Sequence, residues 1–208
     1  SLRQLAVEVV EQVKSAFNYY HAHIYFLDED SGDLVMTGGT GEAGATMLAR
    51  SHKIQKGRGL VGRAAETNTP ILVPDVSQAE GWLPNPLLPE TRSEVAVPIS
   101  SGDQVLGVLD VQQNMVNGLG EEDVELLQSI AGQVAISLKN IRSFEESRAQ
   151  AELEAMANLI SQKIQRTASV EETLQTAIRE LSTVLGASRA KATINLTPQG
   201  NAKSESDS

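Results

Sequence analysis

The stretch from Gln133 to Ala168 contains neither glycine nor proline, and this constrains the fold more than any other feature. Apolar residues alternate at spacings of three and four through the segment before it and into it, which is the pattern of a coiled coil. We expect one helix of about forty residues, roughly 60 Å long. Such a helix is too long for a small domain to bury, so we expect a parallel homodimer. The residues expected at its interface are Val124, Leu127, Ala131, Val134, Leu138 and Ile141.

The apolar stripe of this helix turns polar around Glu145, Arg148 and Glu152 and then resumes on a shifted register. Such a shift resembles a coiled-coil stutter, which unwinds the supercoil locally. The sequence therefore predicts that residues 145–168 form a helical coiled-coil linker.

Residues 1–144 predict one α+β domain with an antiparallel sheet flanked by helices. Apolar spacing predicts a first helix over residues 2–17, and strand-like runs predict two hairpins. Residues 38–44 are expected to form a glycine-rich loop, and residues 77–92, with three prolines, a long loop. The strands are expected at residues 21–27, 34–37, 70–73, 95–99 and 105–111.

The segment from Lys56 to Asp75 is the part of this domain with the clearest functional pattern. Gly57, Gly59 and Gly62 let the backbone turn tightly before a short alanine-rich helix. The free amide groups of such a helix start face whatever lies in front of it. The segment is interpreted as a lid over a pocket, with a simple connection as the alternative.

Residues 169–197 repeat the pattern of the N-terminus at a constant offset of 168 residues. Ser169–Glu172 is a capping box, residues 174–185 form a helical stripe, and residues 191–196 read as a strand. The chain is therefore expected to begin the same domain a second time, as an incomplete helix-strand extension. Residues 198–208 are expected to be a disordered tail.

Composition excludes several classes of function. A formal net charge of −10 argues against a nucleic-acid partner, which would need clustered Lys and Arg. The chain has no cysteine, which excludes a disulfide, a thiolate metal site and a cysteine nucleophile. It has no apolar run long enough to cross a bilayer and no signal peptide, so we expect no membrane contact and a cytoplasmic location.

Five segments in this order resemble the GAF domain family of bacterial signalling proteins. They are Gly57–Gly62, Pro70–Val76, Trp82, Arg92–Ile99 and Gly107–Val111. The resemblance covers about residues 1–144 as a whole domain. It implies a small-molecule pocket between the sheet and a lid, parallel dimerisation through terminal helices, and an output domain or partner signalling protein such as a histidine kinase.

Subtypes of the family differ in their signatures. Members that bind linear tetrapyrroles covalently use a Cys, and free methionine sulfoxide reductases of this fold use catalytic cysteines, which are absent here. The Asn-Lys and Phe-Asp-Glu signature of members that bind cyclic nucleotides is also absent. We therefore expect no covalent chromophore, no metal and no cofactor, and the identity of a non-covalent ligand stays open.

The residues expected to line the pocket come from the lid and the strands around it. Trp82 could form an aromatic wall of the pocket or anchor the long loop on the sheet. Arg92 could bind an anionic ligand or pair with Asp75 or Glu94 to hold the loop. The full expected set is Leu60, Ile71, Asp75, Trp82, Leu87, Arg92, Val95, Val97 and Asp110.

Three other patterns suggest sites but fit poorly. The glycines of residues 39–46 and 57–62 match nucleotide-loop spacings without the strand and helix context these require. Asp28, Asp30 and Asp33 start like a calcium loop, but later ligand positions are missing. His21 and His23 share one face of a strand and could bind a metal, but the sequence places no carboxylate or Cys near them, so surface or boundary packing is favoured.

These observations favour a non-enzymatic sensory module that binds a small molecule and signals through a dimeric helix. The alternative is a structural dimerisation module with an empty pocket in a larger signalling protein. An enzyme would need a nucleophile and a base at usable spacing, and the sequence offers neither.

Overall fold

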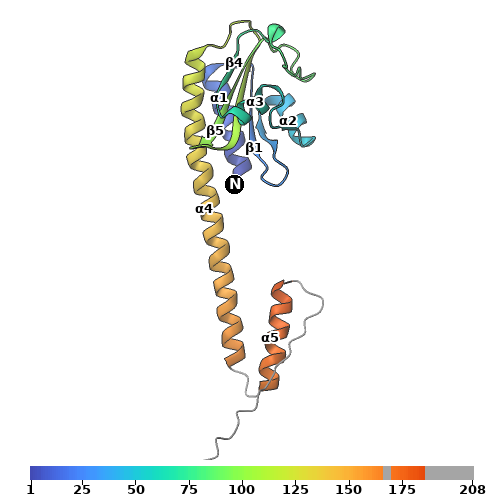
Figure 1. Cartoon of the computed structure of the whole chain (residues 1–208), viewed down its shortest axis with the longest axis vertical. Helices are drawn as coiled ribbons and strands as arrows, with labels where there is room; N and C mark the ends of the chain where they lie inside the picture. The colour runs from blue at the N-terminus through green and yellow to red at the C-terminus, as the bar shows by residue number, and fades with distance from the viewer. Residues whose placement is uncertain (166–169, 186–208) are drawn as a thin grey trace, which may run out of the picture. The chain divides into compact units, whose positions relative to one another are not determined.

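The computed structural model describes residues 1–165 and 170–185 of the 208-residue chain (Figure 1). It divides the chain into two compact units, residues 1–144 and 145–208. The capping residue Ser169, the strand expected at residues 191–196 and the tail expected at residues 198–208 lie outside the described residues.

The first unit is built on one antiparallel sheet with the strand order β3-β2-β1-β6-β5-β4. The two predicted hairpins are confirmed as β1–β2 and β5–β6, and they lie side by side because β1 pairs with β6. The strands are β1 His21–Leu27, β2 Asp33–Gly39, β3 Lys53–Gln55, β4 Ile71–Val73, β5 Ser93–Ser101 and β6 Gln104–Gln113.

Helices cover both faces of this sheet, which confirms the predicted α+β class. Helix α1 and the first part of α4 lie along one face, and α2 and α3 lie over the other (Figure 1). The helices are α1 Leu2–Phe17, α2 Gly41–Ala49, α3 Gly59–Thr67, α4 Glu121–Gln165 and α5 Val170–Leu185, with a short 3-10 turn, η1, at Val76–Gln78.

Period-two alternation along the strands separates two apolar cores. In β5, Val95, Val97 and Ile99 point towards α1 and α4 into what we call the helix-side core. Ala96 points the other way, towards α2 and α3, into what we call the pocket-side core. Both faces of the sheet are therefore buried, as the continuous apolar runs in β5 and β6 indicate.

The expected dimer interface requires a correction. Val124, Leu127, Ala131, Val134 and Leu138 are buried in the helix-side core of their own chain, and Leu127 is 0% exposed. A side chain packed against its own sheet has no surface left for a second copy. The three-and-four spacing marked the face of α4 that covers the sheet, because an amphipathic helix and a coiled coil share this pattern. Of the six residues, only Ile141 is half-buried.

Helix α2 corrects the glycine-rich loop expected at residues 38–44. The helix begins at Gly41, and its residue Gly44 packs directly on the end of β2. A Cβ at Gly44 would lie 2.3 Å from the carbonyl carbon of Gly39, so this glycine permits the close approach of a helix to a strand. Glycine spacing here indicated packing and not a flexible loop.

Helix α4 runs without a break over 45 residues, which confirms the single long helix predicted from the missing glycine and proline. Its second part and α5 belong to the second unit, where Lys163 forms an ion pair with Glu180. The helix predicted after Ser169 is confirmed as α5. Within residues 1–165 and 170–185, no helix combines the length and the apolar character that a membrane span needs.

Candidate functional site

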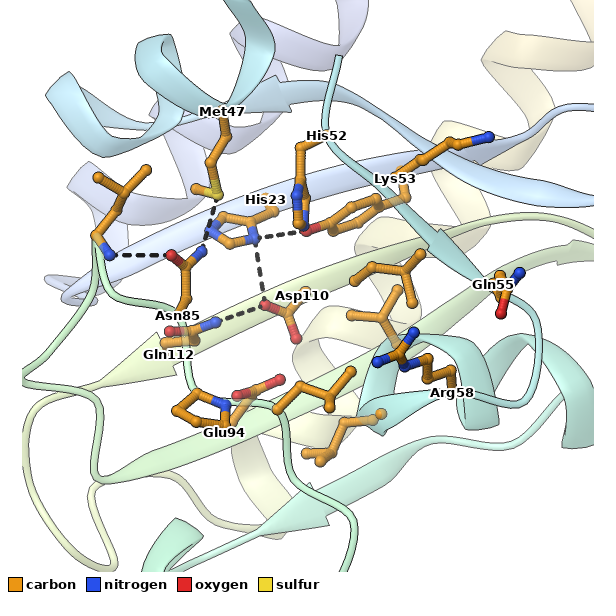
Figure 2. A pocket seen from close by; sticks show the side chains of 18 of the residues that line it. His23, Met47, His52, Lys53, Gln55, Arg58, Asn85, Glu94, Asp110 and Gln112 are labelled. Atoms are coloured by element: carbon orange, nitrogen blue, oxygen red, sulfur yellow. Dashed lines mark hydrogen bonds and ion pairs between the residues drawn. The ribbon is translucent and has the colours of Figure 1, made fainter. Parts of the chain in front are cut away.

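A cavity of about 670 Å³ lies on the face of the sheet that α2 and α3 cover. Strands β1, β5 and β6 supply its floor, α2 and the start of α3 supply two walls, and the loop at residues 83–87 covers it. This volume lies within the range of small-molecule sites in proteins. The first unit thus contains a pocket between the sheet and the segment expected to form its lid (Figure 2).

The floor of the pocket is polar, although the strands that form it are mostly apolar. His23 of β1 lies directly opposite Asp110 of β6, and Gln112 of β6 lies opposite Glu94 of β5. Residues two apart on a strand share a face, so Asp110 and Gln112 both point into the pocket. The side chains of Glu94 and Asp110 are only 6% and 1% exposed.

Hydrogen bonds connect these floor residues to one another (Figure 2). The amide Nε2 of Gln112 donates to Oδ2 of Asp110 at 3.1 Å, and His23 Nδ1 lies 3.2 Å from the hydroxyl of Tyr25. The hydroxyl of Thr91 donates to Oε1 of Gln112 at 2.6 Å. The floor is therefore held in a fixed arrangement by partners on β1, β6 and the long loop.

Burial controls the protonation of this group. Burial, and then the charge of Glu94, raise the pKa of Asp110 well above its usual range, and burial also raises the pKa of Glu94. Burial lowers the pKa of His23 well below its usual value, so His23 is neutral at neutral pH. The charge of one carboxyl disfavours the charge of the other, so a proton shared between the two is favourable.

The start of α3 forms a wall of the pocket and depends on glycine. Gly59 has φ +64°, and a Cβ at Gly62 would lie 2.3 Å from the carbonyl oxygen of Gln55. Leu60, Val61 and the alanines of α3 are buried in the pocket-side core. Helix α3 therefore packs as part of the fold and also supplies one wall of the pocket.

The cover of the pocket comes from the proline-rich loop, where Leu83 to Leu87 line the cavity. Asn85 holds this loop in place with both ends of its amide. Its Nδ2 lies 2.9 Å from the sulfur of Met47 in α2, and its Oδ1 accepts a hydrogen bond from the backbone of Leu87 at 3.0 Å (Figure 2).

Nine residues were expected to line the pocket, and three of them do so: Leu60, Leu87 and Asp110. Val95 and Val97 lie in the helix-side core instead, because they alternate with Glu94 along β5. Ile71 packs against the pocket-side core without lining the cavity.

The remaining three expected residues act in the loop beside the pocket. Trp82 is half-buried against the pocket-side core, and its indole N–H donates to Oε2 of Glu94 at 2.8 Å. Asp75 accepts hydrogen bonds from Ser77 at the start of η1. Arg92 donates to the carbonyls of Pro89 and Thr91, and within residues 1–165 and 170–185 it pairs with neither Asp75 nor Glu94, so the interpretation as an ion pair is wrong.

Sequence reasoning missed the role of His23, Tyr25 and Gln112 and treated Glu94 only as a nearby charge. The signal that could have found them is a polar residue at every second position of an otherwise apolar strand. Asp110 and Gln112 show this pattern in β6, and His21 and His23 show it in β1. A buried polar face of a strand marks a site because such groups need a partner.

The candidate metal ligands behave as structural groups. The rings of His21 and His23 pack edge to face with centroids 4.2 Å apart, and both are buried. Asp28 accepts hydrogen bonds from the backbone of its own turn, and Asp33 pairs with Lys53. In the part of the chain that the structure describes, no group of three or more His, Cys, Asp or Glu is placed to hold a metal.

Comparison with known proteins agrees with this architecture. GAF domain-containing protein A of Dictyostelium discoideum is 30% identical over 122 residues, which cover 59% of this chain and 72% of that protein. Free methionine-R-sulfoxide reductase of Saccharomyces cerevisiae is 39% identical over 79 residues, or 38% of this chain, and the match spans only 43% of the yeast protein.

One solved structure is similar to this chain in its fold. The GAF domain of a phosphoenolpyruvate-protein phosphotransferase from Coxiella burnetii superposes with a TM-score of 0.64 at 21% identity, covering 70% of this chain and 87% of that one. The model of the GAF domain family matches residues 1–139, which include the whole sheet, α1 to α3 and the pocket. The chain therefore belongs to the GAF domain family.

Proposed function

We propose that this chain is a non-enzymatic sensory or regulatory module whose pocket binds a small molecule. The observation that carries the proposal is the 670 Å³ cavity with buried polar groups at its floor and apolar side chains around it. A few fixed polar groups in an apolar pocket are the usual design of a specific ligand site.

Binding without turnover is supported by the chemistry of the chain. One relative is named a free methionine-R-sulfoxide reductase, and reduction of a sulfoxide requires a donor of two electrons. The sequence has no cysteine, so this chain has no thiol to supply them. The described residues that line the pocket also include no Ser, Thr or Cys. The hydroxyl beside His23 belongs to Tyr25, and burial raises the pKa of Tyr25 well above its usual value, which disfavours its nucleophilic form.

The route of the signal follows from the alternation of β6. Asp110 faces the pocket, while its neighbours Leu109 and Val111 pack in the helix-side core against α1 and α4. A ligand that moves the floor of the pocket therefore displaces side chains that contact α4. From there the signal passes to an output domain or a partner signalling protein.

Exposed apolar side chains along α4 support a parallel homodimer as the signalling state. They include Ile136 at 57% and Phe144 at 71% exposed, followed by Leu153, Met156 and Leu159. These residues replace the buried set as the proposed contact between the two copies. Apolar side chains along a long exposed helix favour association with a second helix.

The exposed apolar side chains of α4 also favour the second candidate function, a structural dimerisation module with an empty pocket. Native mass spectrometry of the purified chain beside a denaturing control separates the two. A dimer that carries extra non-covalent mass supports the sensor. A dimer without extra mass, both as purified and after incubation with a cell extract of small metabolites, supports the structural module.

A further inference from the structure

The floor of the pocket contains two buried carboxyls without a cation beside them. Glu94 and Asp110 come from neighbouring strands, and both side chains are almost fully buried. In the described part of the chain, the only basic group within ion-pair distance of either is His23, at 3.7 Å from Asp110, and burial keeps His23 neutral. Trp82 and Gln112 each donate one hydrogen bond to the pair, but neither carries a charge.

One atom of this floor lacks any donor. Oδ2 of Asp110 accepts from Gln112, whereas Oδ1 has no hydrogen-bond partner within the described residues. This second oxygen is buried, although Asp110 itself lines the cavity. Nε2 of His23 is likewise buried without a partner. Buried polar atoms without partners cost free energy, which a ligand that donates hydrogen bonds would recover.

The mouth of the pocket has the opposite charge. Arg50 and Arg58 line the cavity, and within residues 1–165 and 170–185 neither guanidinium forms a hydrogen bond to another residue's side chain or an ion pair. Lys53 also lines it but is neutralised by Asp33 at 2.6 Å. Arg58 extends from the start of α3 towards the same space as Glu94 and Asp110 (Figure 2).

We infer that the pocket selects a small zwitterion, whose ammonium group lies at Glu94 and Asp110 and whose acid group lies at Arg58. The inference rests on the proposed function, because it names the ligand class of the same site. An ammonium group donates three hydrogen bonds, which suits two carboxyls and an unused oxygen. A metal ion fits less well, because two carboxylates are too few for calcium and the cavity is much larger than an ion.

The apolar part of the lining indicates the rest of the ligand. Met47, Leu60, Leu83 and Leu87 surround the space between the two charged ends. The class is therefore an α-amino acid, or a similar zwitterion, with a flexible apolar side chain. Its ammonium group would take the place of the proton that the two carboxyls share in the empty pocket.

Three matched probes test the inference by calorimetry on the whole chain. L-norleucine carries both charges, n-pentylamine lacks the acid group, and hexanoic acid lacks the ammonium group. We expect norleucine to bind most tightly and pentylamine at least tenfold more tightly than hexanoate. Hexanoate binding equal to or tighter than that of pentylamine overturns the inference.

Variants identify which residues bind the ammonium end and the acid end of the ligand. We expect Asp110→Asn to weaken the binding of norleucine and of pentylamine at least tenfold. The control Glu146→Gln removes one exposed charge from α4 and should leave both affinities unchanged. Arg58→Gln, at an exposed position, should weaken the binding of norleucine and leave the affinity for pentylamine unchanged. Equal binding of norleucine by the parent chain and Asp110→Asn, with both folded by circular dichroism, contradicts the inference.

Failure of the inference is distinguishable from failure of the proposed function. A neutral or purely anionic molecule found in the pocket by native mass spectrometry, without binding of norleucine or pentylamine, overturns the zwitterion class and leaves the sensor in place. The inference and the proposed function are both overturned if the purified chain carries no extra mass, gains none after incubation with a metabolite extract, and binds none of the three probes.

Discussion

The indole N–H of Trp82 donates a hydrogen bond to Oε2 of Glu94 at 2.8 Å, across the edge of the pocket. This contact joins the proline-rich loop to the floor of the sheet. It also stabilises the charged form of Glu94 and opposes the rise in pKa that burial causes at this carboxyl.

Replacement of this tryptophan by phenylalanine keeps an aromatic ring and removes the donor. We expect Trp82→Phe to lower the free energy of unfolding by about 1.5–3 kcal/mol, because a hydrogen bond to a charged group is lost. Urea denaturation of Trp82→Phe, Glu94→Gln and the double variant measures the coupling. A coupling energy near zero would mean that the contact contributes nothing to stability.

Asp110→Asn should stabilise the empty protein, and more so at high pH. The pKa of Asp110 is raised in the folded state, so its contribution to stability is full below the unfolded value near 4 and is lost as the pH rises through the folded value. Asparagine carries no such penalty and still donates a hydrogen bond to Glu94. Urea denaturation at pH 5 and pH 8 should show a larger gain at pH 8, and an equal gain at both would refute the assignment.

The stability of the domain should fall in mild acid because of His21. Burial, and then the charge of Lys14, lower the pKa of His21 to about 4. The unfolded ring takes up a proton near pH 6.5, so the contribution of the neutral ring is full above that pH and is lost as the pH falls towards 4. The loss is on the order of 3 kcal/mol.

His21→Gln isolates this contribution, since the side-chain amide can still bond to the hydroxyl of Thr40 that His21 contacts. We expect the parent chain to lose more stability than the variant between pH 7 and pH 4. The two carboxyls of the pocket titrate with the opposite sign, but they are present in both proteins and cancel in the difference. Parallel pH profiles would show that His21 is not the group responsible.

Leu127 should stabilise the domain and not the dimer, because it is buried against the sheet of its own chain. We expect Leu127→Ala to lower the free energy of unfolding by about 2–5 kcal/mol through the cavity it leaves. Light scattering under native conditions should give the mass of the parent chain. If folded Leu127→Ala is a monomer at a concentration where the parent chain is a dimer, Leu127 contributes to the dimer interface and the prediction is wrong.

Phe144 is the matched test of the exposed apolar side chains of α4, since this residue is 71% exposed. We expect Phe144→Ser to weaken the dimer by at least tenfold while the stability of the first unit changes by about 0.5 kcal/mol or less. Sedimentation across a range of concentrations measures the association. An unchanged association constant would place the dimer contact elsewhere.

The sequence by itself determined the elements and the family pattern. Local spacing reports which way residues point along one helix or strand, so α1, the two hairpins and the length of α4 followed from it. The absence of glycine and proline after Gly132 was enough to predict one long helix, because each would interrupt it.

Only the tertiary structure decided what each face contacts. The stripe from Val124 to Leu138 could have faced a second copy or its own sheet, and spacing is the same in both cases. In the same way, Val95 and Glu94 are neighbours in sequence but lie on opposite faces of β5, so the register with β6 determined which one reached the pocket. The pairing of Glu94 with Asp110 depends on strands that are adjacent in space, and no local pattern in the sequence contains that distance.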